Sequence, residues 1–185
     1  HGIKANKSLG QHFLHDDSVC ERMLMGLNLK DKNVLEVGPG PGILTNTLLS
    51  KPLKSLCLIE KDKRFIEILE SMKSPLFSDY RVILKDALRL IPRELFKGEK
   101  YLIIANLPYN IGTELLINWI QDIKNIDSIT VMLQQEVVDR INANTNQKSY
   151  GRLSVLMQNM FEVEEILKVP PQAFLPPPKV HSKVV

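Results

Sequence analysis

The stretch YLIIANLPYNIGTELL, residues 101–116, contains a group of side chains that could act on a substrate amine. Its apolar run stops at Asn106, Leu107, Pro108 and Tyr109. The Asn106 side-chain oxygen and the Leu107 carbonyl could accept hydrogen bonds from the planar amine of adenine and turn its lone pair toward a methyl donor. Pro108 would fix that carbonyl, and Tyr109 would stack on the base. The alternative is a proline turn beside a core tyrosine.

A glycine-rich turn, EVGPGPG at 36–42, follows the apolar stretch NVLEV. Gly38, Gly40 and Gly42 would let a ligand lie against the backbone beside the start of a helix. Tight-turn glycines without a ligand are the alternative. A dinucleotide fingerprint would place its third glycine at position 43, which is Ile43, and this disfavours an NAD site.

Two carboxylates follow the next apolar stretches. Glu60 could accept both hydroxyls of a ribose, or it could be an ordinary surface acid. Asp86 could accept a hydrogen bond from an adenine amine, or it could cap a helix. Together with the glycine turn, these acids favour an adenosine cofactor that lies across three successive strand ends.

The elements that would position these residues alternate along the chain. We predict strands at 33–37, 55–60, 81–85, 101–105 and 128–135, and helices at 16–29, up to 49, 62–72, 89–97, 112–123 and in segments to about 160. Near-continuous apolar strands predict an α/β domain with a mostly parallel sheet covered on both faces. Five of residues 170–179 are proline, which predicts a stiff extended connection between two final strands.

The composition is that of one globular domain of 185 residues, without an apolar run long enough to span a membrane. The two cysteines, Cys20 and Cys57, have no partner at metal-ligand spacing, so we expect buried thiols in a reducing, cytoplasmic compartment and no metal. The net charge of +3 permits a polyanionic partner without requiring one.

Eight motifs in order resemble those of the KsgA-type small-subunit rRNA adenine dimethyltransferases: SLGQHFL, EVGPGPGILT, IEKD, KDAL, NLPYNIGT, LQQEVVDRI, KSYGRLSV and AFLPPPKVHS. The resemblance covers nearly the whole chain. It implies a Rossmann-like methyltransferase with a seven-stranded sheet and S-adenosyl-L-methionine as cofactor. It also implies dimethylation of N6 on two adjacent adenosines near the 3′ end of small-subunit rRNA, in ribosome biogenesis.

The resemblance also assigns roles to individual positions. Asn106, Leu107, Pro108 and Tyr109 would handle the target amine, and Phe174 would cover the far face of the base unless it is a core side chain. Position 12 is Asn or His in the family. The implied cofactor contacts are Gln11, His12, Leu14, Gly38, Gly40, Glu60, Asp86, Ala87 and Asn106.

Two other functions remain open on the same fold. One is Erm-type dimethylation of large-subunit rRNA, which confers antibiotic resistance, and the other is a non-catalytic RNA-binding assembly or transcription factor.

The expected partner is the small-subunit rRNA of an immature particle, with no membrane, no metal and a monomer as the default state. Basic residues near the N-terminal arm and the proline loop, Lys4, Lys7, Lys179 and Lys183 among them, are favoured for phosphate contacts.

The domain organisation expected from the resemblance is a catalytic domain at 1–185 with an N-terminal arm at about 1–15. The sequence ends inside a strand pattern, KVHSKVV. We therefore expect that the family's small C-terminal helical domain, which helps to grip RNA, is absent from this chain.

Overall fold

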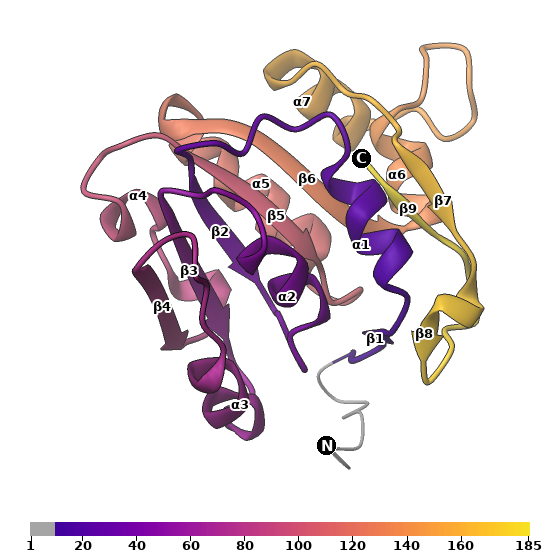
Figure 1. The fold of residues 1–185 in the computed structure, drawn as a ribbon. Helices are drawn as coiled ribbons and strands as arrows, with labels where there is room; N and C mark the ends of the chain where they lie inside the picture. Colours follow the sequence, from indigo (N-terminus) through magenta and orange to yellow (C-terminus); the bar gives the residue numbers. More distant parts are fainter. Residues whose placement is uncertain (1–9) are drawn as a thin grey trace.

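A computed structural model describes residues 10–185, so Lys4 and Lys7 lie outside the described part (Figure 1). Seven strands form one sheet in the order β4-β3-β2-β5-β6-β9-β7. Neighbouring strands from β4 to β6 are parallel, whereas β9 is antiparallel to both β6 and β7. The strands are β2 (Asn33–Val37), β3 (Ser55–Glu60), β4 (Asp79–Leu84), β5 (Tyr101–Asn106), β6 (Ile126–Gln134), β7 (Leu167–Val169) and β9 (Ser182–Val184). The predicted mostly parallel α/β sheet is confirmed.

Helices cover both faces of the sheet, which explains its apolar strands. Val34 of β2 packs in one core cluster and its neighbour Leu35 in the other, because successive strand residues point to opposite faces. The first cluster contains side chains of α1 (Asp17–Leu24), α2 (Ile43–Leu49) and α3 (Ile66–Ser71). The second contains side chains of α5 (Gly112–Trp119), α6 (Gln135–Ile141) and α7 (Arg152–Met160). None of the helices within residues 10–185 is long and apolar enough to cross a bilayer.

The first helix is shorter than the predicted 16–29. Asp16 caps it by accepting a hydrogen bond from the Ser18 amide at 3.0 Å, as its sequence position suggests. The helix ends at Leu24, and Gly26 adopts a φ of +82°. Because a left-handed residue cannot continue a right-handed helix, the apolar period beyond it does not extend α1.

The single helix predicted at 89–97 is wrong. The structure has instead a 3₁₀ turn at Ala87–Arg89 and the short α4 at Pro92–Leu95. Ile91 between them is extended, as expected for a residue whose helical conformation would clash with the following proline.

A second, two-stranded sheet joins the two ends of the described chain. In it β1 (Phe13–Leu14) pairs antiparallel with β8 (Phe174–Leu175). The His15 amide extends the pairing by donating to the Ala173 carbonyl at 3.0 Å. The proline-rich stretch is therefore not one extended connection, because it contains β8 and a 3₁₀ turn at Pro171–Ala173. This sheet holds residues 10–15 close to the proline loop.

Candidate active site

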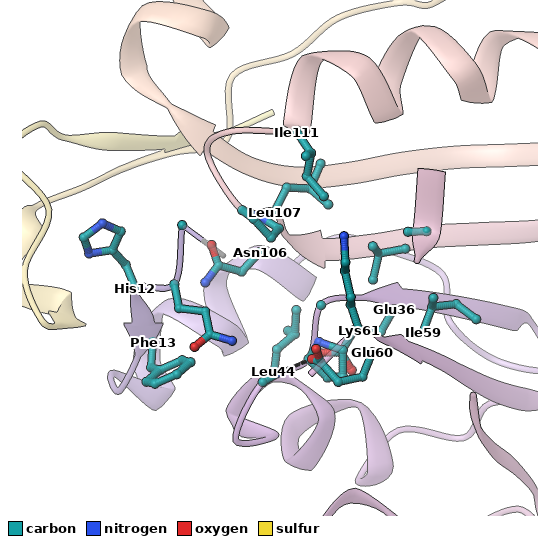
Figure 2. Close-up of a pocket in the computed structure, with 18 of the residues that line it drawn as sticks. His12, Phe13, Glu36, Leu44, Ile59, Glu60, Lys61, Asn106, Leu107 and Ile111 are labelled. Carbon is teal, nitrogen blue, oxygen red and sulfur yellow. Dashed lines mark hydrogen bonds between the residues drawn. The ribbon is translucent and has the colours of Figure 1, made fainter. Parts of the chain in front are cut away.

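A cavity opens at the carboxyl ends of the central strands, where the chain order reverses. The chain runs outward from β2 through β3 to β4 and returns to β5 on the other side of β2, so β2 and β5 flank a switch point. All but one of the predicted site residues line this cavity, and Figure 2 shows several of them pointing into it. They are Gln11, His12, Leu14, Gly38, Gly40, Glu60, Asp86, Ala87, Asn106, Leu107, Pro108 and Tyr109.

The glycine turn lies along one wall of the cavity. Gly38 has a φ of +67° and Gly40 a φ of +55°, a region in which side chains are strained. A Cβ on Gly40 would make only an ordinary van der Waals contact with the Phe13 ring, at 3.4 Å, so the backbone conformation is what requires glycine. The glycines are therefore needed for the turn itself, and the same turn keeps the backbone open to a ligand.

Glu60 is a buried acceptor rather than a surface acid. It is 5% exposed, and its two carboxylate oxygens accept hydrogen bonds from the Asp62 amide at 2.7 Å and the Gly40 amide at 3.0 Å. Burial raises the pKa of this carboxyl, while the backbone hydrogen bonds oppose that shift. The side chain is thus held in one orientation at the end of β3.

Asp86 serves as a helix cap and also takes part in an ion pair. One of its oxygens accepts from the Leu88 amide at 3.1 Å, and the other accepts from Lys61 Nζ at 2.7 Å. The hydrogen bond with Lys61 is the main cause of the lowered pKa of Asp86. The helix-cap alternative is therefore correct, and the carboxylate still lines the cavity.

Two potential acceptors lie at the carboxyl end of β5, on Asn106 and Leu107, which both line the cavity. The Leu107 amide donates to the Met132 carbonyl at 3.2 Å, which continues the pairing of β5 with β6. The Pro108 carbonyl accepts from the amides of Ile111 and Gly112 at 3.2 and 3.1 Å and so begins α5. Within residues 10–185, neither the Asn106 side chain nor the Leu107 carbonyl has a hydrogen-bond partner.

Tyr109 is fixed at its hydroxyl and covered on its ring. The hydroxyl lies 2.5 Å from Ser182 Oγ, at the start of β9. The His12 imidazole stacks on the ring, with centroids 5.4 Å apart and planes at 28°. Burial raises the pKa of the phenol. The neutral hydroxyl and the half-buried ring are typical of a positioned aromatic platform.

The structure places Phe174 in the core and not on the wall of the cavity. Its side chain is 2% exposed and belongs to the core cluster beneath α1. Pairing of β8 with β1 turns Phe174 inward, while its neighbour Leu175 is 65% exposed. The alternative of a core phenylalanine describes its position, and the ring is not among the residues that line the cavity.

Glu36 is a cavity residue that the sequence reasoning missed. It is 1% exposed on β2, and it accepts a hydrogen bond from Thr45 Oγ1 at 2.8 Å. Burial is the main cause that raises the pKa of its carboxyl to about 8, with a smaller contribution from Glu60. The available signal was an acid inside the otherwise apolar stretch NVLEV.

Neighbouring charges change the expectation for the basic residues. Lys183 donates to Asp139 and Glu165, both at 2.7 Å, and its side chain is 14% exposed, so it is poorly placed to contact phosphate. Lys179, before β9, is exposed. No group of three or more His, Cys, Asp or Glu side chains in the described part of the chain could hold a metal ion.

Comparisons with known proteins find relatives with similar sequences and structures. A family model described as ribosomal RNA adenine dimethylase matches residues 2–185. The ribosomal RNA small subunit methyltransferase A of Neorickettsia sennetsu is 41% identical, over 97% of this chain and 69% of the relative. A dimethyladenosine transferase from Plasmodium falciparum has a similar structure, with a TM-score of 0.79 and 27% identity over 94% of this chain and 62% of that one. The 23S rRNA methyltransferase ErmE has a TM-score of 0.76 and 28% identity, over 93% of this chain and 67% of that one.

Proposed function

The chain belongs to the ribosomal RNA adenine dimethylase family, and from that premise we propose that it dimethylates N6 of two adjacent adenosines near the 3′ end of small-subunit rRNA, using S-adenosyl-L-methionine. The observation that carries the proposal is the pair of unoccupied acceptors, Asn106 and the Leu107 carbonyl, beside a cavity that also contains Glu60 and Asp86. The name of the Neorickettsia relative favours the small subunit. The number and location of the methylated adenosines come from the family resemblance.

The residues on the strand ends fit an adenosine cofactor. Glu60, fixed by two backbone amides, would accept the ribose hydroxyls, and the glycine turn would let the cofactor approach the backbone. Asp86 and Ala87 would contact the adenine, with Asp86 sharing its carboxylate between the adenine amine and Lys61. When bound, S-adenosyl-L-methionine supplies an electrophilic methyl group on a sulfonium sulfur. Gln11, His12 and Leu14 would close the cavity from the arm.

The loop after β5 would position the target amine. Hydrogen bonds from the amine to the Asn106 oxygen and the Leu107 carbonyl would favour a pyramidal nitrogen with its lone pair directed at the methyl group. Pro108 holds the loop rigid, and the Tyr109 ring would stack on the base and stabilise the positive charge that develops on nitrogen. No residue of this set is required as a base, since water can take the proton after transfer.

The proposal extends to the setting of the protein. Residues 1–185 would form the catalytic domain, with about 1–15 as its arm, acting as a monomer in the cytoplasm on an immature small subunit. Buried Cys20 and Cys57, both free thiols, support a reducing compartment. The chain spans 62–69% of the three relatives compared above, so activity on whole particles belongs to the proposal.

Methyl transfer from labelled S-adenosyl-L-methionine to purified immature small subunits tests this function. Asn106→Ala removes one of the two acceptors and should lower kcat about 10²- to 10³-fold at saturating cofactor, as loss of one preorganised transition-state contact does. Asn146→Ala, in an exposed loop away from the cavity, is the matched control and should behave as wild type. If the wild-type protein binds RNA tightly but transfers no label, it is a non-catalytic RNA-binding protein.

A second candidate is supported by the similarity to ErmE, which is named for 23S rRNA. The same assay with purified large subunits distinguishes the two substrates. Label that enters only large-subunit rRNA would replace the proposed substrate while leaving the chemistry of the site intact.

A further inference from the structure

One face of the Tyr109 ring is already covered by a side chain from the arm. The imidazole of His12 lies on the Tyr109 ring at 5.4 Å between centroids, and both residues line the cavity. In the view of Figure 2, Asn106 lies between His12 and the Glu60 side of the cavity. His12 thus lies at the end of the cavity where a base would meet the amine-binding loop.

The spacing between these two rings leaves no room for a base. A ring inserted between two others needs about 7 Å between the outer rings, which is twice an ordinary carbon contact of about 3.5 Å. The separation of 5.4 Å is that of two rings in direct contact. A base can therefore reach this face of Tyr109 only when His12 moves away.

Tyr109 is less free to move than His12. Its hydroxyl is joined to Ser182 Oγ at 2.5 Å, and β9, which begins at Ser182, lies between β6 and β7 in the main sheet. His12 belongs to the arm, and its Nδ1 donates to the Pro176 carbonyl at 2.8 Å in an exposed position. One exposed hydrogen bond competes directly with water, so the imidazole is the partner that can be displaced.

We propose that His12 is a placeholder for the target base: it occupies the Tyr109 face in the free protein, and the adenine displaces it to stack there. The inference rests on the proposed function and adds a residue that controls entry of the base. Phe174 is buried, and in the described part of the chain the ring that stacks on Tyr109 is that of His12. Enzymes that act on a base must take it out of its stack, and a covered platform adds a barrier that a weakly held base does not overcome.

His12→Asn tests this, because an amide can still donate to the Pro176 carbonyl but cannot stack as a ring. The matched control is His15→Asn. His15 lies on the same arm and contacts the Gln172 carbonyl of the same loop at 2.9 Å, but its ring does not stack on Tyr109. Comparing the two variants distinguishes the effect of removing the ring from Tyr109 from the effect of loosening the contact between the arm and the loop.

The probe is a short single-stranded RNA that carries 2-aminopurine at the target adenosine, whose fluorescence falls when the base stacks on an aromatic ring. His12→Asn should tighten binding of this RNA, and lower KM for the matching unmodified RNA, by about two- to tenfold, the range that one aromatic contact contributes. His15→Asn should bind this RNA as wild type does.

Three results would refute the proposal that His12 is a placeholder for the base. Weaker RNA binding by His12→Asn would make the imidazole a clamp that holds the base, and unchanged RNA binding would mean that it does not compete. An equal gain in His15→Asn would attribute the effect to the arm as a whole. Failure of the proposed function would appear separately, as a wild-type protein without methyl transfer, and the 2-aminopurine measurement would still decide the role of His12.

Discussion

Replacing the buried Glu36 with glutamine should remove a large part of the pH dependence of folding stability between pH 5 and pH 8. Burial raises the pKa of this carboxyl from 4.5 to about 8 in the folded protein. Glutamine keeps the side-chain oxygen that accepts from Thr45 Oγ1 at 2.8 Å, and it cannot ionise. The substitution therefore preserves the local hydrogen bond and removes the titration.

The direction of the change in stability follows from the pKa of Glu36, which is 4.5 in the unfolded chain and about 8 in the folded protein. Below pH 4.5 Glu36 is neutral in both states, and the preference of the folded state for the neutral carboxyl is fully present. As the pH rises, the unfolded chain ionises while the folded protein keeps the proton, so the free energy of unfolding falls until about pH 8. At about 1.4 kcal/mol per pH unit, the loss across the window is of the order of 4 kcal/mol.

Urea denaturation at pH 5 and pH 8 measures this loss, and fluorescence of the single tryptophan, Trp119, reports unfolding because its side chain is 2% exposed. Asp62 and Asp86, whose pKa values are lowered, contribute in the opposite direction mainly below pH 5. Glu67→Gln on the exposed side of α3 is the control and should follow wild type. Equal loss of stability in wild type and Glu36→Gln between the two pH values would refute the reasoning.

Two further substitutions test the cofactor side and the base side of the cavity. Glu60→Gln should weaken S-adenosyl-L-methionine binding about 10- to 100-fold, because a hydrogen bond to a charged acceptor contributes about 1.5–3 kcal/mol, and calorimetry that shows less than a twofold change would contradict the ribose role. Tyr109→Phe should cost about 1 kcal/mol of unfolding free energy through loss of the Ser182 contact yet keep kcat close to wild type, since the ring remains. Loss of turnover in Tyr109→Phe as large as in Tyr109→Ala would instead make the hydroxyl essential.

Much of the cavity could be predicted because its residues follow strands of a parallel sheet. The carboxyl ends of such strands meet at one edge, so the positions of Glu60, Asp86 and Asn106 after apolar stretches were enough to bring them together. The sequence did not tell whether Asp86 caps a helix or binds a ligand, and the structure shows that a carboxylate with two oxygens caps the 3₁₀ turn and pairs with Lys61.

The errors fall where distant parts of the chain meet. The pairing of β1 with β8 joins two-residue segments that carry no periodic signal of their own, and this pairing turns Phe174 into the core. The stack of His12 on Tyr109 also depends on a contact between the two ends of the chain, the hydrogen bond from His12 to the Pro176 carbonyl. Glu36 was not predicted for a different reason. A single acid in an apolar strand can be recognised as a buried cavity residue only when its burial and its hydrogen bond from Thr45 are known.

The closure of the site by residues far apart in sequence has a consequence for synthesis of the protein. His12 contacts a carbonyl 164 residues further along the chain, and β9 enters the sheet between β6 and β7 only after residues 182–184 have been made. A growing chain translated as far as β7 therefore has β6 without its β9 neighbour and the arm without its β8 partner. An unpaired strand edge invites aggregation, and non-local pairing is slow. The Tyr109 end of the cavity therefore cannot be completed until Ser182, which contacts the Tyr109 hydroxyl, has been made.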